Sequence, residues 1–131
     1  MASEYVVDAS ALIEALASRA DGTARHILRD ARCHAPHLLD AEVGGVLRRR
    51  SRGGLLTEAQ ARSLLRAGAL AIHERYPHGP LAAAAWDLRD NLSYYDALYA
   101  ALAGKLGLPL LTADQRLANT PGLPCAVELI K

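Results

Sequence analysis

Residues 4–18 read EYVVDASALIEALAS, and this stretch decides the fold class. Residues 4–8 predict a short buried strand that ends on an acidic residue, Asp8. Residues 9–18 predict a helix that follows the strand directly. A strand that leads straight into a helix is the repeating unit of parallel sheets whose two faces are covered by helices.

The same alternation continues along the rest of the sequence. Further strands are predicted at residues 33–36, 70–76, 108–112 and 125–129. Further helices are predicted to open at Asp21, at Asp40 as an N-cap, in a capping box at 57–60, at residues 80–91, at Ser93 and after Asp114. We therefore predict an α/β fold with three layers, α/β/α, around a four- or five-stranded parallel sheet, in a single domain covering residues 1–131.

The composition is that of an ordinary globular protein with an aliphatic core. Of the 131 residues, 51% are hydrophobic and 22% are charged, with no Phe and one Trp. The net charge of +1 does not by itself indicate a nucleic-acid partner. The cations are mostly Arg, which suits forked phosphate contacts but also follows from a GC-rich genome.

The two cysteines and the start of the sequence point to a cytoplasmic protein. Cys33 and Cys125 are too few for a disulfide framework and lie in no metal-ligand spacing, so we expect both to be buried and reduced. The polar residues 1–4, and the acids Asp8 and Glu14 that interrupt the apolar stretch after them, argue against a signal peptide. No apolar run has the length of a membrane span.

Four acidic residues lie near predicted helix starts, where each has an ordinary explanation. Asp8 and Asp114 could cap the segments that follow them. Glu42 would lie in the first turn of its helix, where the helix dipole favours an anion. Asp96 would be the fourth residue of a Ser-x-x-Asp capping pattern. Taken singly, each is better explained as a helix-start residue than as a catalytic one.

Taken together, the four acids indicate a metal site. Asp8 and Asp114 follow the carboxyl ends of predicted strands, and ligands of open α/β sheets bind beyond those ends. Glu42 and Asp96, at helix starts, would lie on the same rim. Two carboxylates about 4 Å apart repel by roughly 4 kcal/mol at an effective dielectric near 20, so such a cluster requires a cation or shifted pKa values. Ligation by oxygen alone selects Mg²⁺ or Mn²⁺, which can activate a water for attack on phosphate.

Three blocks of the sequence resemble a known family: VVDASALIEAL at 6–16, LLDAEVGGVLRR at 38–49 and LSYYDALYAALAGKLGLPLLTADQRLA at 92–118. They are similar to PIN domains, and most closely to the VapC toxins of VapBC toxin–antitoxin pairs, from about residue 4 to the end of the sequence. The resemblance implies a Mg²⁺- or Mn²⁺-dependent endoribonuclease that forms a homodimer and is inhibited by a cognate VapB-type antitoxin. It places the metal-binding acids of the family on Asp8, Glu42, Asp96 and Asp114.

Polar residues near the acids have two open interpretations each. The hydroxyls of Ser10 and Thr112, which occupy family-like places, could hold a carboxylate or a water, or could be local turn donors. Arg48 and Arg49 belong to a basic run, 48–52, that is either a solvated helix end or a phosphate-binding patch. Arg116 is a further candidate for contact with RNA.

The aromatic residues and histidines are less informative. An aromatic residue near a nuclease site could stack on a base, but Tyr95 and Tyr99 share one helix face, which favours packing in the core or in a dimer. The five histidines show no His-x-x-x-His spacing, so a zinc site is not expected.

Other classes on a similar sheet fit less well. A receiver domain needs paired acids at the first strand, a haloacid-dehalogenase phosphatase needs Asp-x-Asp, and a dinucleotide-binding domain needs a glycine-rich first turn. The sequence reads Asp-Ala-Ser at 8–10 and has none of these features. The remaining alternative is a PIN fold that binds RNA or a partner with weak or no cleavage.

Overall fold

The first strand, β1 (Glu4–Val7), lies at the centre of a five-stranded parallel sheet. The computed structural model describes residues 3–17 and 22–130, and within them the strand order is β3-β2-β1-β4-β5. The other strands are β2 (Arg32–Pro36), β3 (Glu74–Tyr76), β4 (Leu110–Thr112) and β5 (Val127–Leu129). All four pairings are parallel, which confirms the predicted sheet.

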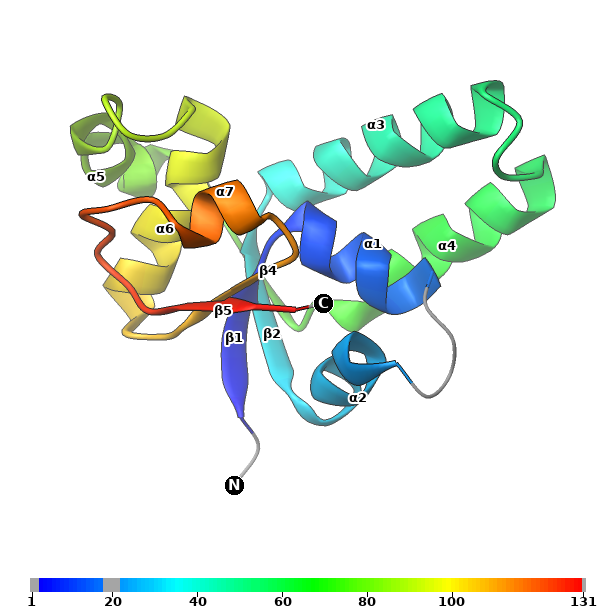
Figure 1. Cartoon of the computed structure of the whole chain (residues 1–131), viewed down its shortest axis with the longest axis horizontal. Coiled ribbons are helices and arrows are strands. Elements are labelled where there is room, and N and C mark those ends of the chain that lie inside the picture. The colour runs from blue at the N-terminus through cyan, green and yellow to red at the C-terminus, as the bar shows by residue number, and fades with distance from the viewer. Residues whose placement is uncertain (1–2, 18–21, 131) are drawn as a thin grey trace.

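Helices cover both faces of the sheet, as predicted. Figure 1 shows α1 to α4 on one side of the strands and α5 and α6 on the other. The helices are α1 (Ala9–Ala17), α2 (Thr23–Asp30), α3 (Leu38–Arg52), α4 (Glu58–Ala71), α5 (Ala82–Asp87), α6 (Tyr94–Leu106) and α7 (Gln115–Ala118). Within residues 3–17 and 22–130, none of them combines the length and the apolar character needed to cross a membrane.

The core is aliphatic and is centred on the two middle strands. Val6, Val7, Leu110 and Leu111 of β1 and β4 are fully buried. On the face covered by α6, seven consecutive residues, 97–103, are buried, and the four that are alanine are small enough for the helix to lie close to the strands. This packing fixes β1 beside β4, so that the carboxyl ends of these strands meet.

Several predicted boundaries were wrong, each for a physical reason that the structure shows. The helix α3 begins at Leu38, so Asp40 is not its N-cap; the Asp40 carboxylate instead accepts from the Arg75 guanidinium at 2.7 Å. The predicted strand at 70–76 is shortened because α4 continues through Ala71, a short apolar run being compatible with either structure. Pro109, which has no N–H to donate, precedes the start of β4 at Leu110.

Other local predictions were confirmed or only partly met. Thr57 forms the expected capping box, in which its hydroxyl accepts from the Gln60 N–H at 3.1 Å and the Gln60 side chain accepts from the Thr57 N–H at 2.8 Å. The predicted helix at 80–91 is a 3₁₀ turn followed by α5, which ends at Asp87. Cys33 is buried, but Cys125 is half-buried; both are free. Residue 18 and Asp21 lie outside the described residues.

Candidate active site

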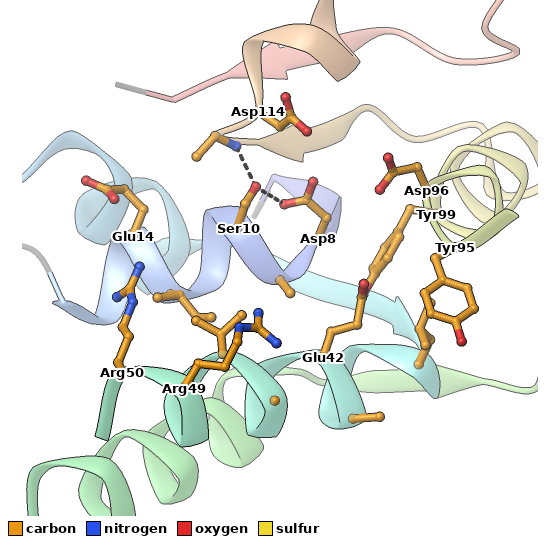
Figure 2. A pocket seen from close by; sticks show the side chains of 17 residues that line it. Asp8, Ser10, Glu14, Glu42, Arg49, Arg50, Tyr95, Asp96, Tyr99 and Asp114 are labelled. Carbon is orange, nitrogen blue, oxygen red and sulfur yellow. Dashed lines mark hydrogen bonds between the residues drawn. The ribbon is translucent and has the colours of Figure 1, made fainter. Parts of the chain in front are cut away.

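The four predicted acids line one pocket at the carboxyl end of the sheet. Asp8 directly follows β1 and Asp114 follows β4, while Glu42 comes from α3 and Asp96 from the first turn of α6. The pocket has a volume of about 610 Å³. Figure 2 shows the four carboxylates arranged around it, contributed by four different elements. The structure therefore brings together all four of the acids predicted from the sequence.

Asp8 is the most deeply placed of these acids. Its side chain is only 6% exposed, and its Oδ1 accepts hydrogen bonds from the Ser10 hydroxyl at 2.7 Å and the Ala11 N–H at 2.9 Å. Its Oδ2 accepts from the Thr112 hydroxyl at 2.5 Å. Burial raises the pKa of Asp8, the three hydrogen bonds oppose that rise, and the charge of Asp96 adds to it. The carboxylate is therefore held in one orientation while remaining costly to ionise.

The hydroxyls of Ser10 and Thr112 connect the ends of β1 and β4. Besides donating to Asp8, Ser10 accepts from the Ala113 N–H at 3.0 Å and Thr112 accepts from the Asp114 N–H at 3.0 Å. The two hydroxyl oxygens lie 3.2 Å apart. This arrangement fixes the position of Asp8 relative to the backbone that carries Asp114.

Glu42 is held by a buried tyrosine. The Tyr99 hydroxyl donates to Glu42 Oε1 at 2.5 Å, and Tyr99 is 1% exposed. Burial raises the pKa of Glu42; the Tyr99 hydrogen bond opposes this, and the charges of Asp96 and Asp8 add to it. Because α3 begins at Leu38, Glu42 lies beyond the first turn, so the dipole explanation for it was wrong.

The role of Tyr99 was missed from the sequence, although the spacing held a signal for it. Three residues separate Asp96 and Tyr99, which places them on the same face of α6. Packing in the core was confirmed for Tyr99, whereas Tyr95 is 59% exposed and lines the pocket, so packing in a dimer stays a prediction for Tyr95. The contact with Glu42 depends on how α3 packs beside α6, and helical spacing alone does not give that.

Asp96 and Asp114 share a single cation. One guanidinium nitrogen of Arg116, Nη2, lies 3.3 Å from Asp96 Oδ2 and 3.2 Å from Asp114 Oδ2. Asp114 also caps α7, its Oδ1 accepting from the Arg116 N–H at 2.9 Å and the Leu117 N–H at 3.3 Å. The helix-cap explanation therefore holds for Asp114 together with its place in the pocket.

The donor set fits a hard divalent cation, although the carboxylates do not converge fully. Within residues 3–17 and 22–130, no three Asp, Glu, His or Cys side chains lie close enough together to form a ready metal site. The ionisable ligands among the described lining residues are carboxylates, with neither His nor Cys. The guanidinium of Arg116 between Asp96 and Asp114 shows that the site already attracts positive charge. Oxygen donors of this kind suit Mg²⁺ or Mn²⁺.

The basic run at the end of α3 is divided between two faces. Arg49 and Arg50 line the pocket that holds the acids. Arg48 lines a separate hollow with Arg52 and Arg62, so the structure separates it from the other predicted RNA contacts. Arg50 was not singled out from the sequence; it lies four residues after Val46, which also lines the pocket, and this helical spacing was the signal that could have identified it.

Comparisons with known proteins agree on one family. The model of the PIN domain matches residues 5–123. Ribonuclease VapC1 of Mycobacterium tuberculosis is 49% identical over 131 residues, covering 98% of each chain, and VapC ribonuclease Mb0985 of Mycobacterium bovis is 41% identical, covering 95% of this chain and 97% of its own. The crystal structure of PAE2754 from Pyrobaculum aerophilum superposes with a TM-score of 0.73 at 28% identity, covering 97% of this chain and 84% of that one.

Proposed function

The chain belongs to the PIN-domain family, with VapC ribonucleases among its relatives, and from this premise we propose that it is a metal-dependent endoribonuclease. In this proposal it acts as the toxin of a type II toxin–antitoxin pair and hydrolyses phosphodiester bonds of RNA. The observation that carries the proposal is the convergence of Asp8, Glu42, Asp96 and Asp114 on one pocket at the carboxyl end of the sheet.

The four carboxylates would hold Mg²⁺ or Mn²⁺. When bound, the cation supplies the positive charge that activates water and offsets the charge developing on phosphate. Ser10 and Thr112 keep Asp8 oriented toward the pocket, and Tyr99 does the same for Glu42. Arg49, which lines the pocket, and Arg116, which contacts Asp96 and Asp114, would contact phosphate oxygens of the RNA.

The relatives support a proposal for the partners of this chain. One neighbouring structure is described as VapBC2 from Rickettsia felis bound to a DNA fragment from their promoter, and another as a member of the VapBC family of toxin–antitoxin systems. We propose that a VapB-type antitoxin inhibits this chain, that it forms a homodimer, and that it acts in the cytoplasm. Growth arrest on expression, relieved by co-expressing the short neighbouring reading frame, tests the toxin role.

The alternative is a PIN fold that binds RNA or a partner without efficient cleavage. It is favoured by one observation, that no three acids of the described residues form a ready metal site. Cleavage of RNA in Mg²⁺ or Mn²⁺ by the native protein, compared with Asp8→Asn and Asp96→Asn, separates the two. Each substitution replaces a carboxylate with an amide of nearly the same volume, so folded variants without activity support the metal site. Equal cleavage by all three proteins would exclude it.

A further inference from the structure

The pocket that holds the acids extends along α3 beyond them. Glu42, Gly45, Val46 and Arg49 recur at helical spacing, so they share one face of α3, and all four line the pocket. Seven residues at about 1.5 Å rise each place Arg49 roughly 10 Å from Glu42 along the helix. The pocket is therefore a groove along α3, with the four predicted acids at one end and the α3 positions of Arg49 and Arg50, together with Glu14 of α1, at the other.

The guanidinium groups at that end have no partner within the described part of the chain. Arg75 and Arg116 make ion pairs with carboxylates, whereas neither Arg49 nor Arg50 does in residues 3–17 and 22–130. Figure 2 shows Arg50 rising from α3 toward α1, where Glu14 faces it across the groove, while Arg49 extends along α3 in the direction of Glu42. Unpaired guanidinium groups that line a groove fit an anionic ligand, and their planar fork matches phosphate.

Two consecutive glycines in the middle of α3 support the same interpretation. Glycine is disfavoured inside helices, so a pair of them requires a reason. Gly45 lines the groove, and a Cβ there would lie 3.6 Å from Arg49 Nη1. Gly44 lies on the other side, where a Cβ would meet nothing within 4 Å. The missing side chain of Gly45 leaves room for the Arg49 guanidinium, which lies over this position on the side toward Glu42.

We propose that Arg49 and Arg50 bind backbone phosphates of the RNA next to the bond being cleaved, on a strand that lies over Gly45 between α1 and α3. The proposal rests on the proposed function and adds the path of the substrate. It assigns this role to Arg49 and Arg50 and not to Arg48 or Arg52, which belong to the same basic run but line the other hollow. These arginines position the substrate and take no part in the bond-breaking step.

Binding of a fluorescein-labelled, 12-nucleotide single-stranded RNA tests the proposal. The measurement is fluorescence anisotropy at several KCl concentrations in Mg²⁺, in an Asp96→Asn background that leaves the RNA intact. The pair R49Q/R50Q is compared with the matched pair R48Q/R52Q, which removes the same two charges from the same helix. We expect the slope of log K against log[KCl] to fall in magnitude by about 1.4 for R49Q/R50Q, from two phosphate contacts of about 0.7 each, and to stay unchanged for R48Q/R52Q.

Equal losses in both pairs would overturn the proposal, because only the total charge would then matter. Absence of RNA binding by the background protein, together with absence of cleavage by the native one, would refute the proposed function as well. Three further variants give a test that does not remove positive charge. Gly45→Leu should weaken RNA binding while Gly44→Leu should not, and Glu14→Gln should tighten it. Circular dichroism confirms that each variant is folded.

Discussion

Replacing Arg116 with Gln should strengthen metal binding. Arg116 is the cation that now lies between Asp96 and Asp114, at 3.3 and 3.2 Å from one oxygen of each. A divalent ion that uses these carboxylates has to displace the guanidinium first. The variant removes this competitor and leaves all four acids in place.

The magnitude follows from the geometry and from exposure to solvent. At this distance each pair gains about 1 kcal/mol in a water-like dielectric. The Arg116 side chain is 71% exposed, and exposed ion pairs are measured at about 0.2–1 kcal/mol each. A total near 1 kcal/mol corresponds to roughly fivefold tighter binding of Mn²⁺ by Arg116→Gln. Without metal, the unfolding free energy should fall by a similar amount, because two neighbouring carboxylates lose their counter-ion.

Isothermal titration with Mn²⁺ measures the affinity, and urea denaturation in EDTA measures the stability. Arg66→Gln is the control, because it removes the same charge from the exposed side of α4. An Mn²⁺ affinity that is unchanged or weaker in Arg116→Gln would refute the reasoning and would show that Arg116 supports the metal site.

Three further predictions concern the site and the helix that carries Glu42. Because burial raises the pKa of Asp8 above its ordinary value of 3.8, the folded protein holds this proton more tightly than the unfolded chain does, and stability is lost as pH rises through the raised value. Urea denaturation in EDTA should therefore show that the unfolding free energy of Asp8→Asn increases relative to that of the native protein between pH 4 and neutrality. A difference in unfolding free energy that stays constant over this range would contradict the prediction. Tyr99→Phe removes the hydrogen-bond donor to Glu42, so the pKa of Glu42 should rise further and Mn²⁺ binding near pH 5 should weaken. The unfolding free energy should fall by about 1–2 kcal/mol. Unchanged Mn²⁺ titration and urea denaturation curves would count against this prediction. Gly44→Ala and Gly45→Ala should each raise the unfolding free energy by about 0.5–1 kcal/mol, since neither Cβ meets a closer atom than 3.6 Å; a lower melting temperature for either would be the opposite result.

The sheet and the acids at its edge were predictable because the signals are local. Asp8 follows β1 directly, and Asp114 comes two positions after the end of β4. Parallel strands bring these two ends together at one edge of the sheet. Element boundaries were less predictable, because a better tertiary partner can replace a local one. Asp40 shows this: its carboxylate pairs with Arg75 on β3 instead of capping the helix start.

Contacts between elements distant in sequence could not be read from the sequence. The Tyr99–Glu42 hydrogen bond joins residues 57 positions apart on two helices, and its formation depends on the rotation of each helix in the packed domain. The division of the basic run between two faces of α3 was easier to predict from the sequence. Arg49 lies seven residues after Glu42, which is two helical turns, so it returns to the same face, whereas Arg48 is rotated by about 100° from it.

The hydroxyl contacts of Asp8 also set a time at which the site can form during synthesis. Asp8 and Thr112 are separated by 104 residues, and the hydrogen bond between them needs β4 to be in place beside β1. At about 5–20 residues per second, a ribosome makes Thr112 roughly 5–20 s after Asp8. Until then the nascent chain lacks both Asp114 and the hydroxyl that orients Asp8. A protein proposed to cut RNA is thereby kept inactive at least until Thr112 and Asp114 have left the ribosome that translates its own message.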